Sequence, residues 1–327
     1  MKKIFKKNYK FIIVLLIAFI ALTFRFPYYI DAPGGITNIS KKIEIDGYAS
    51  KGTFNLAYVK EYNATIPTLL ISLIKKDWKI VKENEILMDT EDNKTYEIRD
   101  KIFIKESVSN AIYVAYKKAS KGIKITSNKL LVSYVVAKAN TDIKVGDQIL
   151  SINNIEINDK EQISDIINNL HIGDKISIKV KNNNKEYNRY AYIIEDDGKK
   201  IGILISSINE YETTPKVKVN IDKNESGSSG GLITALSIYN SLVEEDITHG
   251  LTIVGTGTID IDGNIGSIGG VEYKLKSAVK SKADLFIVPL DENYNEAIKL
   301  KEKNRYKIKI IGVSTFDEVI NYLKEIE

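Results

Sequence analysis

Three serines and three glycines lie close together in the segment Ser226–Gly231, directly before a stretch with helical spacing. Glycine permits a tight turn and lets the backbone approach a ligand closely. The helix that follows begins with free N–H groups and the positive end of its dipole, which stabilise negative charge on a neighbouring group. A serine in this segment is therefore a candidate nucleophile. The alternative is an ordinary glycine-serine loop in which a serine caps the helix.

A second candidate is Lys274, on the helix that we expect over residues 271–282. Positions 271, 274, 278 and 281 share one face of that helix, and Lys274 is the only charged residue among them. Lys276 lies on another face, where it can pair with Glu272 four positions earlier. A lysine on a weakly polar face can be buried, and burial favours the neutral amine that a general base needs. The alternative is a surface lysine whose amine reaches the solvent.

A serine hydroxyl is a weak nucleophile unless a base lies beside it. The 327-residue chain contains two histidines, His171 and His249, and both lie in turn-like sequences close to a glycine. Neither has the neighbours typical of a triad histidine. The chain has no cysteine, which excludes a thiol nucleophile, disulfides and thiolate metal sites. A lysine base therefore remains, which with a serine of the loop would form a Ser–Lys dyad.

Two segments downstream of the serine loop carry a family resemblance. They are Thr256-Gly257-Thr258-Ile259-Asp260 and Gly263-Asn264-Ile265-Gly266-Ser267-Ile268-Gly269-Gly270-Val271-Glu272-Tyr273-Lys274. Together with the serine loop they resemble the proteolytic domain of the Lon protease family. In that family a Gly-Pro-Ser-Ala-Gly loop, a strand with Thr-Gly and an Ile-Gly-Gly motif precede the catalytic lysine. The resemblance implies Ser229 as the nucleophile, Lys274 as its base and Thr256 as the residue that supports the lysine.

The serine loop departs from the family pattern at two positions. Ser228 stands where proline is usual, and Gly230 stands where alanine is usual. Ser228 and Ser226 therefore remain alternatives to Ser229. In the expected mechanism, Lys274 takes the proton of Ser229 and later protonates the leaving amine, while backbone N–H groups near Ser229 stabilise the oxyanion.

The residues around the dyad alternate between strand-like and helix-like patterns. Strands are predicted at 217–221, 251–261, 284–288 and 308–313, and helices at 231–243, 271–282, 293–302 and after the capping box Thr315–Glu318. This order predicts an α+β domain in which helices cover a sheet. We assign this domain, the Lon-type proteolytic domain, to residues 199–327.

A second unit precedes this domain, at residues 118–198. A strand-like run at 130–136 is followed by Val-Gly-Asp-Gln-Ile-Leu-Ser-Ile-Asn at 145–153, a helical stripe at 161–170 and an alternating strand at 175–180. This order resembles a PDZ domain, which binds an extended peptide as an additional strand. The loop near residues 126–129 lacks a Gly-Leu-Gly-Phe pattern, so recognition of a free C-terminus stays open.

The first 30 residues predict a membrane anchor. Five lysines, at positions 2, 3, 6, 7 and 10, precede the uncharged stretch Phe11–Phe24. These fourteen residues span about 21 Å as a helix, less than the roughly 30 Å of a bilayer core, and we expect Lys10 and Arg25 to reach across the difference. The lysines place the N-terminus in the cytoplasm and the C-terminal domains outside, which predicts a single-pass protein of the cell membrane. A cleaved signal peptide is the alternative.

Residues 31–117 carry no catalytic constellation. Strand-like alternation occurs at 43–45 and 53–59, and an amphipathic helix is predicted at 107–118. The segment Tyr28–Gly35 resembles a part of the membrane-anchored Lon-like proteases. We interpret this region as an α+β shoulder that supports the two domains after it.

Several function classes are excluded by composition and motifs. The chain has 47 basic and 43 acidic residues, a net charge of +4, without the basic stripe that indicates nucleic-acid binding. It lacks the Gly-x-x-x-x-Gly-Lys-Ser/Thr loop of an ATPase and any histidine cluster for a metal. We therefore expect no ATP, no metal and no other cofactor.

The combined prediction is an α+β multidomain chain with an N-terminal transmembrane helix, a PDZ-like β-rich domain and a Lon-type protease domain. It resembles the PDZ-containing, membrane-anchored Lon-like proteases of Gram-positive bacteria. The resemblance implies an ATP-independent serine endopeptidase that cleaves secreted or surface peptides and proteins, and family analogy allows a homo-oligomer. The alternative is a non-catalytic anchored protein in which the PDZ unit binds peptides or assembles a complex.

Overall fold

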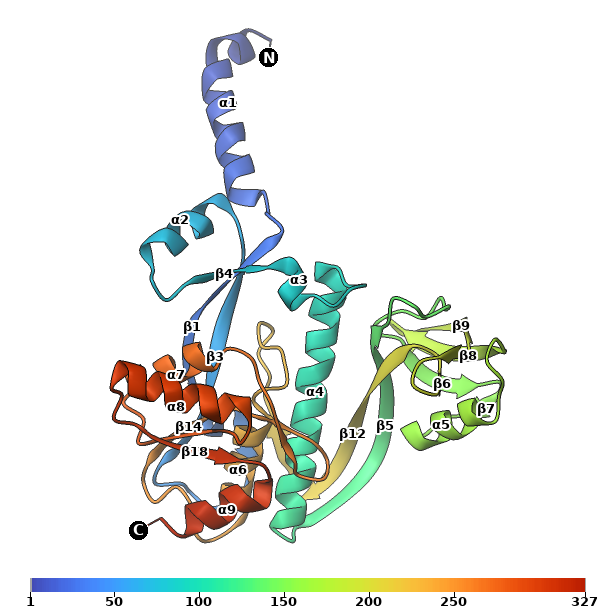
Figure 1. Ribbon diagram of the computed structural model, residues 1–327, viewed down its shortest axis with the longest axis vertical. Coiled ribbons are helices and arrows are strands. Elements are labelled where there is room, and N and C mark those ends of the chain that lie inside the picture. Colours follow the sequence, from blue (N-terminus) through green and yellow to red (C-terminus); the bar gives the residue numbers. More distant parts are fainter. Residues whose placement is uncertain (1, 327) are drawn as a thin grey trace.

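The computed structural model describes residues 2–326, with side chains from Asn8 onward. Its centre is a six-stranded sheet in the order β18-β17-β14-β3-β1-β4 (Figure 1). The strands are β1 (Tyr28–Asn38), β3 (Thr53–Asn63), β4 (Lys79–Lys82), β14 (Thr252–Gly255), β17 (Leu285–Pro289) and β18 (Lys309–Val313). The parallel pairing of β14 with β3 joins the beginning of the chain to its C-terminal part in one sheet.

Helices cover both faces of this sheet. Successive residues of β17 alternate between two cores: Leu285 and Ile287 belong to one hydrophobic cluster, and Phe286 and Val288 belong to the other. Because both faces are buried, the parallel strand is continuously apolar. The first cluster includes residues of α4 (Asn93–Lys118), α6 (Gly231–Leu242) and α9 (Phe316–Lys324), and the second includes residues of α7 (Val271–Lys280) and α8 (Glu292–Asn304).

A smaller β-rich unit lies beside this body (Figure 1). Its sheet has the order β12-β5-β6-β8-β9, with β7 paired to β6. Alternate residues of β8, namely Ile176, Ile178 and Val180, are buried in a separate core, as the alternating pattern predicts. The elements are β5 (Gly122–Val135), β6 (Gln148–Ile152), β7 (Ile155–Glu156), α5 (Lys160–Asn168), β8 (Lys175–Asn182), β9 (Lys185–Tyr192) and β12 (Ile203–Thr214).

The long strands β5 and β12 connect the β-rich unit to the body (Figure 1). They pair in antiparallel register from Ile203 opposite Val135 to Thr214 opposite Gly122. The pair contacts α4, where Ser109 Oγ donates to a carbonyl oxygen of β12 at 3.0 Å. The predicted boundary between residues 198 and 199 lies between β5 and β12 in the sequence. Because these two strands pair with each other, the β-rich sheet contains residues from both sides of that boundary.

The N-terminal helix α1 runs over Lys2–Thr23 and projects from the body (Figure 1). The prediction that it spans a membrane is wrong, as is the single-pass location that depended on it, because no helix among the described residues is both long and apolar enough for a span. The physical reason is the short apolar part of α1, whose uncharged stretch begins only at Phe11. The side chains of the predicted basic flank Lys2, Lys3, Lys6 and Lys7 lie outside the described set.

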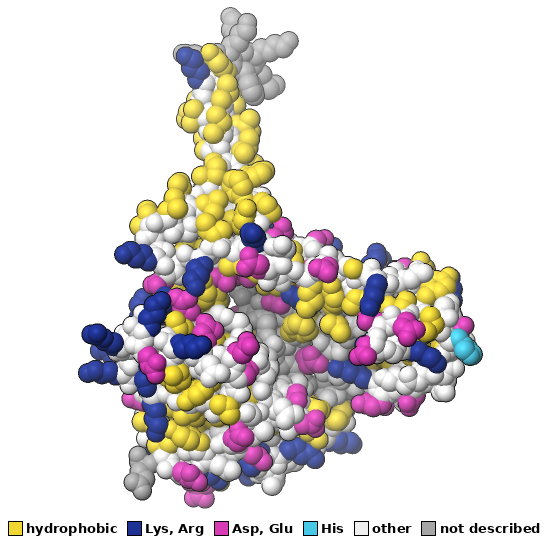
Figure 2. Space-filling model, in the orientation of Figure 1, with side chains coloured by type: hydrophobic (Ala, Val, Ile, Leu, Met, Phe, Trp, Pro, Cys, Tyr) yellow, Lys and Arg dark blue, Asp and Glu magenta, His cyan; other side chains and the backbone are white. Residues whose placement is uncertain are grey.

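The remaining elements are short and surround this framework. Figure 2 shows apolar side chains on the surface of α1 and α2, and those exposed there include Leu16, Leu73 and Ile74. This surface is at the end of the molecule opposite α9 (Figure 1). The short elements are η1 (Ile39–Lys42), β2 (Ile43–Ile45), α2 (Ile66–Ile74), α3 (Glu83–Ile86), β10 (Ile194–Glu195), β11 (Lys199–Lys200), β13 (Val217–Val219), β15 (Thr258–Ile259) and β16 (Ile265–Gly266).

Candidate active site

The serine segment forms the loop between β13 and α6, and α4 holds this loop in place. The Gly227 N–H donates to the Asp100 carbonyl oxygen at 3.1 Å, and the φ of Gly227, 80°, is one that favours glycine. The Ser107 hydroxyl donates to the Ser228 carbonyl oxygen at 2.9 Å. Because positions 100 and 107 share one face of α4, a single helix face fixes the loop through two hydrogen bonds.

The glycine at position 231 lets α6 begin in close contact with its neighbours. A Cβ atom at Gly231 would lie 2.7 Å from Ser107 Oγ and 2.8 Å from Ile259 Cγ2, so the space admits no side chain. The Ser229 carbonyl oxygen accepts a hydrogen bond from the Gly257 N–H at 2.9 Å. Through these contacts the serine loop packs against the segment between β14 and β15.

Lys274 lies in the first turn of α7 and is almost fully buried, with 3% of its surface exposed. Burial lowers the pKa of the Lys274 amine from 10.5 to about 7. The predicted helix face is confirmed at three of its four positions: Val271 and Ala278 are buried with Lys274, whereas Ser281 is exposed just after the end of α7. Lys276 is partly exposed and pairs with Glu272 at 2.9 Å. About half of the Lys274 amines are therefore neutral near pH 7.

Thr256 connects the lysine to the serine loop. The Lys274 amine donates to Thr256 Oγ1 at 3.1 Å, and Thr256 Oγ1 donates to the Ser229 carbonyl oxygen at 3.2 Å. Thr256 is completely buried, and its N–H donates to the Ile287 carbonyl oxygen of β17 at 3.0 Å. Within the described part of the chain, no hydrogen bond joins the Ser229 hydroxyl to the Lys274 amine directly, and the two residues are linked through Thr256.

Ser229 and Lys274 line the same cavity, which has a volume of about 1390 Å³. Its walls are formed by β1, β3, the serine loop, the N-terminus of α7 and one face of α4. Tyr96, Asp100 and Ser107 lie at helical spacing along that face. The volume exceeds the roughly 300–1,000 Å³ that is usual for small-molecule sites.

The two alternative serines lie in the wall of the same cavity. Ser226 is exposed, and its side chain lies close enough to the Asp100 carboxyl group to favour the ionised form of Asp100. Ser228 is half-buried, and its carbonyl oxygen is bound by Ser107. Among the described contacts, Ser229 is the serine whose backbone is joined to the buried lysine through a threonine hydroxyl.

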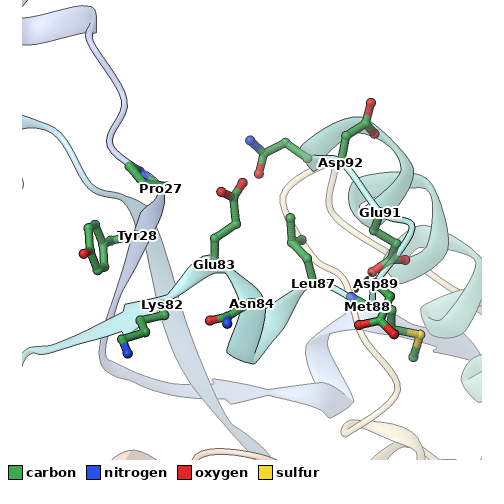
Figure 3. Close-up of a pocket in the computed structure, with 11 residues that line it drawn as sticks. Pro27, Tyr28, Lys82, Glu83, Asn84, Leu87, Met88, Asp89, Glu91 and Asp92 are labelled. Carbon is green, nitrogen blue, oxygen red and sulfur yellow. Dashed lines mark hydrogen bonds between the residues drawn. The ribbon is translucent and has the colours of Figure 1, made fainter. Parts of the chain in front are cut away.

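A second cavity, of about 580 Å³, lies where α3 leads into α4 (Figure 3). None of the predicted site residues lines it, and one of its carboxylates, Glu91, is paired with Arg99 of α4 at 2.8 Å. The second cavity is therefore separate from the candidate dyad. Figure 3 shows the acidic side chains around it, which are Glu83, Asp89, Glu91 and Asp92.

Neither histidine lines the large cavity. His171 is exposed in a turn of the β-rich unit beside Asp174. His249 lies in the C-terminal region, where its ring Nε2 is 2.9 Å from the Leu323 carbonyl oxygen. Both histidines are therefore outside the candidate site, and of the bases considered from the sequence only Lys274 lines the cavity.

Asp100 and Ser107 hold the serine loop, and neither was predicted from the sequence. Both belong to the region that was interpreted as a shoulder without site residues. Their helical spacing with Tyr96 was the available signal, because a polar and aromatic face on a helix that is otherwise packed indicates a lined cavity. The spacing of these residues along the helix does not by itself show which loop this helix face contacts.

Two family models match the chain. The model described as "PDZ domain" matches residues 110–189, and the model described as "Lon protease (S16) C-terminal proteolytic domain" matches residues 214–325. The first match covers most of the β-rich unit. The second contains Ser229, Thr256 and Lys274.

Curated relatives that match the chain include Lon proteases. The Lon protease of Aster yellows witches'-broom phytoplasma is 34% identical over 95 residues, which are 29% of this chain and 12% of that protein. Lon protease 2 of Bacillus subtilis is 35% identical over 95 residues, 29% of this chain and 16% of that protein. The chain thus spans less than a fifth of these relatives. Among solved structures, the PDZ domain of an SdrC-like protein from Listeria monocytogenes is 22% identical with a TM-score of 0.23, over 25% of this chain and 92% of that chain.

The family matches place a PDZ domain and a Lon-type proteolytic domain in one chain, in that order. In its domains the chain therefore resembles a PDZ-containing Lon-like protease, as the serine-loop and Val-Gly-Asp resemblances predict. The family prediction is confirmed for these two domains.

Proposed function

We propose that the chain is a serine endopeptidase in which Ser229 attacks the peptide bond and Lys274 acts as the general base. Thr256 positions the lysine through the 3.1 Å hydrogen bond from its amine. Peptides and unfolded protein segments are the proposed substrates, and they bind in the large cavity that both dyad residues line.

The buried lysine is the observation that carries this proposal. Burial lowers the pKa of Lys274 to about 7, and an amine with that pKa can accept a hydroxyl proton near neutral pH. Among the described residues the Lys274 amine has no acidic partner, and its one hydrogen bond goes to the Thr256 hydroxyl. Because an unpaired buried lysine costs stability, its presence at the wall of a cavity favours a functional role.

The chemistry proceeds in two stages. As Ser229 Oγ attacks the carbonyl carbon, its proton passes to Lys274, and an acyl-enzyme forms when Lys274 gives that proton to the leaving amine. The oxyanion lies near the start of α6, where the N–H groups of Ser229 and Gly230 donate to no other group in the described part of the chain. Water then releases the acyl group by the reverse sequence of proton transfers.

The domain division is part of the proposal. The β-rich unit, residues 118–198, recognises or orients the substrate by adding an extended segment to its sheet. The proteolytic unit comprises residues 199–327 and is supported by residues 31–117, whose strands β1 and β3 extend its sheet. The sequence contains no ATP-binding loop, so the proposed cleavage is independent of ATP and acts on segments that are already extended.

The proposal is tested by cleavage of casein and of a quenched fluorescent peptide library by the full chain and its variants. Ser229→Ala and Lys274→Met should abolish cleavage. Ser228→Ala should retain it, and so should Lys276→Met, which removes a partly exposed lysine from the same helix. Cleavage that survives Ser229→Ala but disappears in Ser228→Ala would assign the nucleophile to Ser228.

A further inference from the structure

Strand β3 has a free edge inside the large cavity. Its residues Thr53–Leu56 pair with β14, which ends at Gly255. Residues 57–63 pair with β1 on one side, and no described strand pairs with their other side. Every residue from Tyr58 to Asn63 lines the cavity. At this point the sheet is open to a further strand.

The hydrogen-bond ladder indicates which groups of β3 face this edge. The Ala64 N–H donates to the Tyr28 carbonyl oxygen at 3.0 Å, and the register continues without a shift as far as Lys60. Bonded and non-bonded pairs alternate in an antiparallel ladder, so Lys60 and Tyr62 bond to β1. Glu61 therefore directs its N–H and C=O groups to the free edge, where an extended peptide can bind them.

Two carboxylates lie near the free edge, one on β3 itself and one on the adjacent strand β1. Asp31 of β1 lies directly opposite Glu61 of β3, a cross-strand position at which like charges repel. The side chain of Glu61 reaches solvent, but its burial within the concave cavity and the nearby Asp31 charge raise its pKa to about 7. Burial also raises the pKa of Asp31. Among the described residues neither carboxylate has a salt bridge. Glu61 accepts a hydrogen bond from Tyr96 at 3.2 Å. Lys79 is near enough to attract Asp31, but its salt bridge is with Glu272.

We propose that the free edge of β3 binds the substrate as an added strand, and that Asp31 and Glu61 receive a lysine or arginine side chain of that strand. A cation between the two carboxylates removes their repulsion and forms charge-assisted hydrogen bonds with them. This inference rests on the proposed function, because the same cavity holds Ser229 and Lys274. The substrate class is then an extended peptide segment that carries a basic residue.

The separation of Leu56 and Glu61 along β3 indicates how far the basic residue of the substrate lies from the cleaved bond. Leu56 lies against the serine loop, where a Cβ atom at Gly230 would be 3.0 Å from Leu56 Cδ2. A strand advances by about 3.3 Å per residue, so the chain from Leu56 to Glu61 covers about 17 Å. The preferred basic residue therefore lies about five residues from the cleaved bond.

Binding is measured with the full chain carrying Ser229→Ala, so that the peptide stays intact. Fluorescence anisotropy compares labelled peptides that differ only in a lysine or a glutamine at one position. The lysine peptide should bind about tenfold more tightly, the gain expected from one charge-assisted hydrogen bond. The added double substitution Asp31→Asn/Glu61→Gln should remove this preference. The control Glu195→Gln, at an exposed carboxylate of the β-rich unit, should keep it.

N-methylation of single amides of the peptide tests whether the peptide binds as an added strand. This test changes only the peptide and leaves every residue of the β3 edge in the protein unchanged. Binding should weaken at every second position, because alternate residues of an added strand bond to β3. Equal weakening at all positions, or at none, would contradict strand addition.

Cleavage of the lysine peptide by the wild-type chain is recorded in parallel. Preferential binding without any cleavage would refute the proposed dyad and leave the basic-residue site standing. Equal binding of the lysine and glutamine peptides, or a preference that survives the double substitution, overturns the site even when both peptides are cut.

Discussion

Lys274→Met removes a titrating amine from the cavity wall and keeps most of the side-chain volume. In the folded chain burial lowers the pKa of Lys274 to about 7, whereas the hydrated amine of the unfolded chain has its ordinary value of 10.5. Between these two pH values folding releases a proton, so stability rises with pH. The wild-type chain therefore loses stability as the pH falls from 10.5 to about 7, and a methionine at this position makes no such contribution.

The magnitude follows from the difference between the two pKa values. At about 1.4 kcal/mol per pH unit, the buried amine costs the wild-type chain about 4 kcal/mol of stability at pH 7. Lys274→Met should remove this cost and stabilise the chain by a few kcal/mol near neutral pH. The difference in the free energy of unfolding between the variant and the wild type should shrink by about 3 kcal/mol between about pH 6.5 and about pH 9.5. Peptide cleavage should be absent in the variant throughout, which separates the effect on stability from the effect on catalysis.

Urea denaturation followed by circular dichroism measures both chains across this pH range. Lys276→Met is the matched control. Burial alone would lower the pKa of Lys276, but hydrogen bonds to Asp77 and Glu272 outweigh it and raise the pKa, so this lysine is protonated in the folded and unfolded chains over the range. Its stability difference from the wild type should not vary with pH. A Lys274→Met variant that is less stable than the wild type at neutral pH, or a difference that is independent of pH, would refute the reasoning.

Three further predictions concern the same site. Gly231→Ala should lower stability by about 1–3 kcal/mol and reduce cleavage, because its methyl group would meet Ser107 Oγ at 2.7 Å; unchanged thermal unfolding would contradict the close contact. Thr256→Val should lower kcat by about 10–100-fold with little change in KM, because valine cannot accept the Lys274 hydrogen bond; steady-state kinetics in which only KM rises would exclude the positioning role. The pH profile of kcat/KM should rise through about pH 7 as Lys274 becomes neutral, and a profile that falls over this range would exclude Lys274 as the base.

The buried lysine could be predicted because its signal is local. Positions 271, 274 and 278 share one helix face and the structure buries all three, whereas Ser281, predicted on the same face, is exposed. The serine loop and the Val-Gly-Asp run are likewise short segments, and the family matches that contain them confirm the two domains. The roles of Ser229, Thr256 and Lys274 stay predictions, since a spacing along the chain does not show which hydroxyl loses its proton.

The contribution of residues 28–63 could not be predicted, because it depends on pairing between distant parts of the chain. Strand β3 lies beside β14, which follows it only after the whole β-rich unit. In β1 the alternating pattern is interrupted at Pro33–Gly35, where the register with β3 shifts. Sequence periodicity therefore indicates isolated strands here, and the shared sheet that forms a wall of the cavity becomes visible only in the structure.

Helices α4 and α1 were misjudged for related reasons. The helix predicted at 107–118 is the last part of α4, which begins at a capping box formed by Asp92 and Thr95. Its first half is strongly charged and lines a polar cavity, so it lacks the apolar stripe of a packed helix. In α1 the opposite error occurred, since an apolar stretch of fourteen residues was extended to a membrane span by the assumed reach of Lys10 and Arg25.

Covalent labelling of the nucleophile tests most directly whether Ser229 is activated by Lys274. The full chain is treated with a sulfonyl fluoride, an electrophile that reacts with activated serines, and the modified residue is located by peptide mass spectrometry. We predict one adduct, on Ser229, that is lost in Lys274→Met and kept in Lys276→Met. An adduct on Ser226 or Ser228, or equal labelling of Ser229 in the absence of Lys274, would contradict the dyad.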